Sequence, residues 1–557
     1  MPDRPFAWER SYPATVRWDA PVATGLVTDL LDEAVARFPD KPALTFLGRS
    51  ISYMELGRHV ARAAAALEIE GVGPGHAVAL FLPNTPWHPV FFFALLKRGA
   101  RVVHISPLDA GREIAHKLQD SGARILITTD LGGLAEGARK LEAAGLVERL
   151  IIAENTMWTG GGARAAADGN QRSAMAMLEA APAAPRTSPR LSPDDVALLQ
   201  YTGGTTGLPK AAMLRHANLT AAVSIYFNWA EPQGLVSYGA DRIVCVLPLF
   251  HIFALTAVLL LGVKSGAEIL LHPRFDPAAV IDDIEKRRAT RFSGVPTMWI
   301  AIANFPGVET RDLSSLISIA SGGAACPVEI ENRIGSLTGL RLGGGWGMTE
   351  TAPAGTNIPH GCPKSGTIGL PLPGIEMDIV ALDDSARRLS AGEVGEIRVK
   401  GPNVITGYWN KPEENARAFV DGYLLTGDIG RMDEDGYFFI VDRKKDMIIS
   451  GGFNVYPRTI EEAIYEHPAV AEVSVIGIAD AYRGEAAKAF IALKPGQSEF
   501  TLEDLRAFLA DRIGRHELPA AVEFRSSLPK TPVGKLSKKE LIAEERAKAA
   551  GKAPSAG

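Results

Sequence analysis

The segment Tyr201-Thr-Gly-Gly-Thr-Thr-Gly-Leu-Pro-Lys210 directly follows the apolar run of residues 196–199. Glycines allow a backbone to approach phosphate oxygens closely, while threonine hydroxyls and a lysine ammonium supply hydrogen bonds and positive charge. The segment therefore predicts a polyphosphate-binding loop at the end of a buried strand. Thr205 is also assigned to catalysis, and the other predicted phosphate-binding residues are Thr202, Gly203, Gly204, Thr206, Gly207 and Lys210.

This loop differs from the Walker type, because the spacing G-x-x-x-x-G-K-[ST] does not fit its residues. The chain also contains no G-x-S-x-G elbow and no H-E-x-x-H helix motif. These differences disfavour a kinase, a hydrolase and a metalloprotease.

Length and charge limit the architecture and the partners. The chain has 557 residues, of which 46% are hydrophobic, and single cores stop growing at about 250 to 300 residues, so we expect at least two domains. With 59 Lys and Arg against 64 Asp and Glu, the net charge is −5. No global field favours nucleic acid, and an anionic ligand must be held locally.

The sequence predicts a cytoplasmic protein without a transmembrane segment. Its three cysteines show no CxxC spacing, and residues 1–20 lack the apolar stretch of a signal peptide. The longest apolar run, residues 252–263, is shorter than the roughly 18 to 20 residues of a membrane span and is expected to be a buried core segment. Transient contact with a membrane is compatible with such a protein.

Helix-like and strand-like stretches alternate along most of the chain, which indicates an α/β fold with parallel sheet. Strands are expected at 77–82, 123–128 and 149–153, a helix at 111–121, and a flexible surface excursion at 160–190. We place a domain boundary after residue 441, giving an N-terminal domain of residues 1–441 and a C-terminal domain of residues 442–557.

The predicted C-terminal domain is a small α+β unit. Strands are expected at 473–478, 487–493 and 522–524. A helix over 502–513 is expected to begin at a capping box formed by Thr501 and Asp504.

Four further motifs follow the loop in the chain: Gly344-Gly-Trp-Gly-Met-Thr-Glu-Thr351, Thr426-Gly-Asp428, Asp442-Arg-Lys-Lys-Asp446 and Pro529-Lys-Thr-Pro-Val-Gly-Lys535. Together with the loop, they resemble, in order, the motifs of AMP-forming adenylate-forming enzymes. That family includes acyl-CoA synthetases, firefly-type luciferases and the adenylation domains of peptide synthetases. The resemblance covers about residues 26–543 and implies a large N-terminal adenylate-forming domain of packed α/β sheets with a small mobile C-terminal domain.

The resemblance assigns a nucleotide site. Trp346 would lie beside the adenine, where the family more often has tyrosine, and Thr349 would contact the α-phosphate. Glu350 would hold Mg²⁺, a hard cation that prefers carboxylate and phosphate oxygens. Asp428 would accept hydrogen bonds from the ribose hydroxyls, with Arg443 as a nearby donor. The remaining residues assigned to this cofactor site are Gly323, Ala324, Gly347 and Met348.

Lys535 is implied to be the catalytic lysine of adenylation, because a mobile cation can stabilise the charge that accumulates between a carboxylate and the α-phosphate. Lys445 corresponds to the hinge residue of the family. Gly451 and Gly452 would line the tunnel for the pantetheine arm of coenzyme A. ATP, Mg²⁺ and coenzyme A are thus the implied cofactors and co-substrate.

The acid substrate is expected to be apolar. No Asp or Glu lies between residues 242 and 267, which disfavours an amino acid, since a buried ammonium without a partner is unfavourable. By resemblance His251 is a catalytic gate or wall residue, and this region is similar to bacterial medium- and long-chain fatty-acid–CoA ligases, including the pimeloyl type that accepts dicarboxylates.

Several alternatives stay open. Benzoate-like aryl acids are the alternative substrates, and a separate acyl carrier protein is the alternative acceptor. A luciferase-like oxygenase would share every motif, whereas a non-catalytic AMP-binding regulator would be expected to lack Lys535 or Glu350. The oligomeric state is open, with a homodimer as one alternative.

Overall fold

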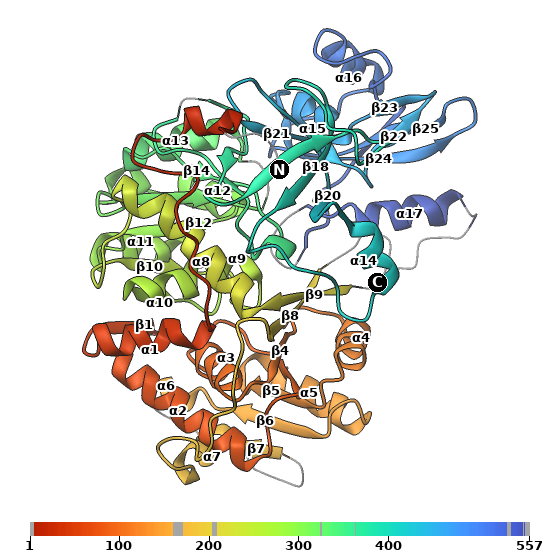
Figure 1. The fold of residues 1–557 in the computed structure, drawn as a ribbon. Coiled ribbons are helices and arrows are strands. Elements are labelled where there is room, and N and C mark those ends of the chain that lie inside the picture. The colour runs from red at the N-terminus through yellow and green to blue at the C-terminus, as the bar shows by residue number, and fades with distance from the viewer. Residues whose placement is uncertain are drawn as a thin grey trace. The chain divides into compact units, whose positions relative to one another are not determined.

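The computed structural model describes residues 5–159, 171–202, 209–323, 326–362, 364–531, 536–549 and 551 (Figure 1). The chain packs into two compact units. The first contains the described residues up to 376 together with 400–419, and the second contains 377–399 and the described residues from 420 onward. Residues 377–399 and 420–441, expected in the N-terminal domain, thus pack with the second unit, while the boundary after residue 441 stays a prediction.

The first sheet of the first unit carries the strand that leads into the predicted phosphate loop. Its strand order is β7-β6-β5-β3-β4-β8-β9, and all neighbours are parallel except β8 and β9. Helices α4 and α5 pack on one face of this sheet. The strands are β3 (Ala77–Leu80), β4 (Arg101–His104), β5 (Ile125–Thr129), β6 (Arg149–Ala153), β7 (Gln171–Ser173), β8 (Val196–Thr202) and β9 (Lys210–Arg215).

The helices of the first 180 residues include the one predicted at 111–121, which is confirmed as α4. They are α1 (Val27–Arg37), α2 (Tyr53–Ile69), α3 (Trp87–Lys97), α4 (Gly111–Ser121), α5 (Leu134–Ala143), α6 (Thr156–Thr159) and α7 (Ala174–Ala180). The three strands predicted at 77–82, 123–128 and 149–153 are also confirmed, as β3, β5 and β6.

The expected surface excursion at 160–190 is wrong for its middle part. Strand β7 pairs with β6, and Ala174 and Leu178 of α7 are buried. Ala181 joins Ala65 and Ala66 of α2 in a small apolar cluster. Alanine forms helices well, and its short side chain lets two helices approach closely, so an alanine-rich composition was compatible with packed structure. Residues 160–170 lie outside the described residues.

The second sheet of the first unit has the order β14-β13-β12-β10-β11-β1-β2, with only β2 antiparallel to its neighbour. Its strands are β1 (Pro42–Phe46), β2 (Arg49–Ser52), β10 (Arg242–Cys245), β11 (Glu268–Leu271), β12 (Arg291–Gly294), β13 (Ser318–Ser321) and β14 (Gly343–Gly344). The helices that pack on one face are α11 (Pro277–Lys286), α12 (Pro296–Ala303) and α13 (Val328–Thr338).

The longest apolar run of the sequence follows β10. It forms three consecutive helical segments, and most of their side chains are buried, so the expected core segment is confirmed. In the part of the chain that the structure describes, no helix is long and apolar enough to cross a membrane. The segments are α9 (Ile252–Ala254), the π-helical η4 (Leu255–Leu260) and α10 (Leu261–Ser265), and the last two contact α8 (His216–Ala230).

The second unit contains two small sheets. The first has the order β17-β18-β20-β19 with β21 on β20, and the second has the order β23-β22-β25-β24 with β26 on β25. These strands are β17 (Glu376–Val380), β18 (Gly395–Lys400), β19 (Phe419–Val420), β20 (Tyr423–Met432), β21 (Phe438–Arg443), β22 (Ile448–Ser450), β23 (Phe453–Val455), β24 (Val470–Asp480), β25 (Gly484–Leu493) and β26 (Ala521–Phe524).

The expected strands at 473–478, 487–493 and 522–524 are confirmed inside β24, β25 and β26. The capping box is confirmed as well, since the Asp504 N–H donates to Thr501 Oγ1 at 3.1 Å and the Thr501 N–H donates to Asp504 Oδ2 at 3.0 Å. Helix α16 (Leu502–Leu509) ends before residue 513, where turns replace it. The other helices are α15 (Pro457–Tyr465) and α17 (Lys539–Ala549).

Candidate active site

Strands β8 and β9 form a hairpin around the predicted phosphate loop. They are antiparallel, with Thr202 opposite Lys210, so the structure brings these two predicted residues together. The loop itself, with Gly203, Gly204, Thr205, Thr206 and Gly207, lies outside the described residues, and its role stays a prediction.

Lys210 begins β9 and contacts a segment about two hundred residues later in the chain. Its ammonium forms an ion pair with Glu414 of α14 (Pro412–Ala418) and lies 5.5 Å from the ring centroid of Tyr408. Burial lowers the pKa of Lys210, although the nearby charge of Glu350 opposes this effect. Sequence reasoning missed both Tyr408 and Glu414.

The segment that carries these two residues is attached to β9 by backbone hydrogen bonds. The Trp409 N–H donates to Ala211 O at 2.9 Å, and the Met213 N–H donates to Gly407 O at 3.1 Å. Tyr408 itself lies opposite Ala212 in a β-bridge. This pairing fixes the ring of Tyr408 next to the start of β9.

Glu350 lies in the short helix η6 (Thr349–Thr351) and is 5% exposed. Its Oε1 accepts a hydrogen bond from the Tyr408 hydroxyl at 2.8 Å. Burial, and secondarily the charge of Glu350, raises the pKa of Tyr408 above its ordinary value, so the hydroxyl keeps its proton. Tyr408 therefore contacts both the predicted phosphate-binding lysine and the predicted metal-binding carboxylate.

The environment of Glu350 suits a magnesium ion that is shared with phosphate. Among the described residues, no group of three or more His, Cys, Asp or Glu side chains forms a complete metal cage. Mg²⁺ is commonly bound by one or two carboxylates together with substrate phosphates and water. A single buried carboxylate near Lys210 fits that mode.

The backbone around Trp346 makes contacts so close that only glycine fits at two positions. The backbone N–H of Trp346 donates to Thr356 Oγ1 at 3.0 Å, and the backbone N–H of Thr356 donates back to Trp346 O at 2.8 Å. A Cβ on Gly355 would lie 2.5 Å from Trp346 Cε3, and a Cβ on Gly347 would lie 1.4 Å from Pro353 O. The indole therefore packs directly on the backbone of Gly355, a residue that sequence reasoning missed.

The predicted adenine-site loops leave the same edge of the second sheet. Gly323 follows β13, and the Trp346 loop follows β14. Since β13 and β14 are parallel, with Ser321 opposite Gly344, both loops leave from the carboxyl ends of adjacent strands. This edge is where open α/β sheets bind ligands. Ala324 lies outside the described residues, whereas Met348 and Thr349 lie half-buried between Gly347 and Glu350.

His251 ends a loop that two side-chain amides hold. Asn84 donates to Leu247 O at 2.9 Å and accepts from the Leu249 N–H at 2.8 Å. Gln200, on β8, donates to Phe250 O at 3.0 Å. His251 itself is half-buried and caps α9. The strand that precedes the phosphate loop is thus connected directly to the His251 loop, which sequence reasoning did not foresee.

Two buried histidines, His88 and His104, lie near Gln200, one of the side chains that hold this loop. The rings of His88 and His104 are 5.0 Å apart, and His104 Nδ1 donates to Gln200 Oε1 at 2.9 Å. Burial lowers the pKa of His104 to about 4, even though the hydrogen bond to Gln200 opposes the shift, and burial holds the pKa of His88 well below its ordinary value. Both rings are therefore neutral near pH 7, and they add no charge beneath the loop.

In the second unit, Asp428 and Arg443 are cross-strand neighbours on β20 and β21. Arg443 Nε lies 2.6 Å from Asp428 Oδ1, and Asp428 is 2% exposed. Beside them, Lys444 pairs with Glu396 at 2.7 Å, and Glu396 also accepts the Gly427 N–H at 3.0 Å. The structure thus brings together the two residues predicted to contact a ribose.

Lys445 follows β21, and Gly451 and Gly452 form the turn between β22 and β23. The two glycines have φ values of +58° and +84°, and an added Cβ would meet no atom within 4 Å. A left-handed turn therefore explains the glycines at these positions. Their role in a pantetheine tunnel, and the hinge role of Lys445, stay predictions.

Lys535 lies outside the described residues, but the chain on both sides of it is firmly held. Lys530 and Leu536 form a β-bridge, and the Ser537 N–H donates to Pro529 O at 2.8 Å. Lys538 pairs with Glu461 at 2.9 Å. The described residues on the two sides of Lys535 are therefore held close to each other, while the role of Lys535 stays a prediction.

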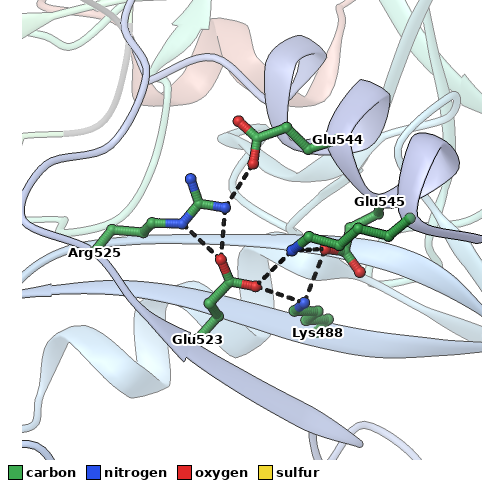
Figure 2. Close-up of polar contacts among 6 residues, drawn as sticks. Lys488, Glu523, Arg525, Glu544 and Glu545 are labelled. Carbon is green, nitrogen blue, oxygen red and sulfur yellow. Dashed lines mark hydrogen bonds and ion pairs between the residues drawn. The ribbon is translucent and has the colours of Figure 1, made fainter. Parts of the chain in front are cut away.

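A network of charges fixes helix α17 (Figure 2). Arg525 pairs with Glu523 and with Glu544 of α17, each at 2.6 Å. Lys488 of β25 pairs with Glu523 at 2.8 Å and with Glu545 of α17 at 2.9 Å. These contacts connect α17 to two strands of the same sheet.

Comparison with known proteins agrees with the motifs. Residues 31–409 match the family described as AMP-binding enzyme, and residues 459–535 match the AMP-binding enzyme C-terminal domain. A long-chain-fatty-acid–CoA ligase of Bacillus subtilis (strain 168) is 38% identical, covering 97% of this chain and 98% of the relative. A feruloyl-CoA synthase of Amycolatopsis sp is also 38% identical, covering 90% and 96%.

Among solved structures, the ATP-bound crystal structure of MatB from Rhodopseudomonas palustris superposes with a TM-score of 0.83 at 28% identity. The match covers 94% of this chain and 100% of that one. The likeness therefore extends over the fold as well as the motifs. The chain belongs to the AMP-binding, adenylate-forming family and is an acid–thiol ligase.

Proposed function

We propose that this protein joins a medium- or long-chain fatty acid to coenzyme A. In the first step a carboxylate oxygen of the acid attacks the α-phosphorus of ATP, the bond to the β-phosphate oxygen breaks, and pyrophosphate leaves. In the second step the thiolate sulfur of coenzyme A attacks the acyl carbon, and AMP leaves with the electron pair of the carbon–oxygen bond. The products are acyl-CoA, AMP and pyrophosphate.

The observation that carries the first step is the meeting of Lys210 and Glu350 at Tyr408. A lysine ammonium can bind phosphate oxygens, and a buried carboxylate next to it can share a magnesium ion with the same phosphates. When bound, Mg²⁺ would neutralise charge on the leaving pyrophosphate. Tyr408 thus contacts both the carboxylate of Glu350 and the ammonium of Lys210, the two groups proposed to act on the phosphates.

The remaining nucleotide roles follow the family motifs. Trp346 would stack on the adenine beside the loop of Gly323, and Thr349 would donate to the α-phosphate. Asp428 would accept from the ribose hydroxyls, with Arg443 holding its carboxylate in place at 2.6 Å. Lys535 would stabilise the charge that develops in the first step.

The preference for an apolar acid is supported by the surroundings of His251. No Asp or Glu lies between Arg242 and Ala267, and the apolar segment after His251 is largely buried. The buried imidazoles of His88 and His104 are neutral, so they provide no partner for a substrate ammonium. Each methylene buried from water contributes about 0.8 kcal/mol, so chain length should govern affinity until the site is filled.

An aryl acid is the second candidate substrate, because a feruloyl-CoA synthase is as similar in sequence as a fatty-acid ligase. Both kinds of acid are apolar behind their carboxylate. They differ in width and flexibility, and the chain-length series below separates them.

The test is pyrophosphate release by the purified protein with ATP and Mg²⁺, with and without coenzyme A. The acids are straight-chain acids of increasing length, dicarboxylates, benzoate and ferulate, and Lys535→Ala is the control. Sustained turnover that requires coenzyme A and peaks at one chain length supports the proposal. Preference for ferulate or benzoate would instead favour an aryl acid as the substrate. Release of one equivalent of pyrophosphate, whether or not coenzyme A is present, would point to a carrier protein as the acceptor.

A further inference from the structure

The ion pair between Lys210 and Glu414 involves a residue for which the proposed chemistry has no use. Glu414 belongs to none of the nucleotide-binding motifs, yet its carboxylate forms an ion pair with Lys210, whose ammonium is proposed to bind phosphate. The side chain of Lys210 is 37% exposed and that of Glu414 is 42% exposed. Both groups can therefore be reached by a ligand without unfolding of the surrounding chain.

A carboxylate resembles a phosphate oxygen in charge and in the hydrogen bonds that it accepts. Lys210 already lies near Glu350, whose charge raises the lysine pKa against the effect of burial. Two carboxylates, Glu350 and Glu414, thus lie near the ammonium of Lys210, whose pKa the nearby charge of Lys411 also lowers. A polyphosphate that binds Lys210 would therefore be repelled by Glu414, while Glu350 would be neutralised by the metal ion that it shares with the phosphates.

We propose that Glu414 is an internal competitor for polyphosphate at Lys210. Its carboxylate holds the lysine side chain close to Tyr408, and nucleoside triphosphate binds by taking over the ammonium from it. The same carboxylate recaptures the lysine as pyrophosphate leaves. This inference rests on the proposed use of Lys210 in phosphate binding, and it makes Glu414 a positioning residue that weakens nucleotide affinity.

The test compares Glu414→Gln with Glu413→Gln in the full-length protein. Glu413 is adjacent, its side chain is 87% exposed, and it pairs with Arg417 within the same helix. Binding of ATP and of pyrophosphate is measured by titration calorimetry at low and at high ionic strength, and thermal melting checks that both variants are folded.

Glu414→Gln is expected to bind ATP and pyrophosphate about three- to tenfold more tightly at low salt, which is the range for a partly exposed charge pair plus removal of one repulsive charge. The gain should shrink at high salt, where such charges are screened. Glu413→Gln should bind as the wild type does. Equal or weaker binding by Glu414→Gln would overturn the proposal.

A double-mutant cycle separates the lysine pairing from a general effect of charge. In a Lys210→Gln background, Glu414→Gln should improve ATP affinity by a smaller factor than in the wild-type background, because only the direct repulsion of the polyphosphate remains to be removed. An undiminished gain in that background would also overturn the proposal. If the wild type binds ATP but forms no acyl-adenylate with any acid, the proposed function fails while this comparison of affinities still decides the role of Glu414.

Discussion

Two charged clusters show how the same residue types serve different purposes. At the start of β9, Lys210 pairs with one carboxylate, and both side chains are about 40% exposed. In the second unit, Lys488, Glu523, Arg525 and Glu545 each pair with at least two partners, and their side chains are 11% to 28% exposed (Figure 2).

The number and exposure of its ion-pair partners determine whether a charged side chain can exchange a partner for a ligand. A charged side chain with several fixed partners keeps most of its stabilisation when a single contact is broken. Removing that side chain altogether, however, leaves its buried partners with an unpaired charge. A charge with one exposed partner can exchange that partner for a phosphate at small energetic loss. The network in the second unit is thus structural, whereas the Lys210 pair is suited to exchange.

The largest effect should come from breaking the network. Lys488→Met removes the more buried of the two lysines that Glu523 and Glu545 share, leaving only the more exposed Lys548, and we expect the second unit to lose about 3 kcal/mol of stability. Hydrogen exchange of the β25 and β26 amides measures the loss. Lys494→Met, an exposed lysine directly after β25, is the matched control and should change protection little. Equal protection in the two variants would show that the network does not stabilise the sheet.

Lys210→Gln should give the opposite pattern, with a large effect on binding and a small one on stability. Loss of a charge-assisted hydrogen bond to phosphate removes about 2 kcal/mol, or roughly thirtyfold in ATP affinity. The melting temperature should stay within about 1 °C of the wild type, because the pair with Glu414 is half-exposed. Titration with ATP and thermal melting check both parts, and a strongly destabilised variant would contradict the contrast between the clusters.

Tyr408→Phe keeps the ring near Lys210 but removes the hydroxyl that donates to Glu350 at 2.8 Å. The carboxylate is then less well oriented, and we expect the Mg²⁺ concentration for half-maximal adenylation to rise about tenfold. Pyrophosphate release across a magnesium series measures this shift. Tyr482→Phe, at a fully surface-exposed position (96% exposed), serves as the control.

The smallest effect should be a dependence of stability on pH. Burial raises the pKa of Glu523, but hydrogen bonds from Lys488, Lys548 and Arg525 outweigh this effect and lower the pKa to about 2. Because the folded pKa lies below the unfolded one, this stabilisation is complete above about pH 4.5 and is lost as the pH falls toward 2. After allowance for solvent screening we expect about 1 kcal/mol. Melting curves of wild type and Glu523→Gln between pH 5 and pH 3 should converge as the pH falls.

Local sequence determined the parts of the site that depend on the backbone. The predicted strand before residue 202 agrees with the structure, and so does the proximity of Asp428 to Arg443. The strand follows from a short apolar run that ends at glycines, which a single sequence displays directly, whereas the Asp428–Arg443 pair was implied by the family resemblance. Membership of the family came from the same motifs.

Tertiary structure alone decided which side chains complete the site. Tyr408 and Glu414 reach Lys210 across about two hundred residues of chain, and the His251 loop is held by Asn84 from the loop after β3 and by Gln200 from β8. Gly355 had a local signal, since it lies nine residues from Trp346, but its closeness to the indole depends on how β15 (Thr356–Asn357) folds back. Motifs specify backbone shape and chemical groups, whereas the partners of those groups are set by the packing of distant segments.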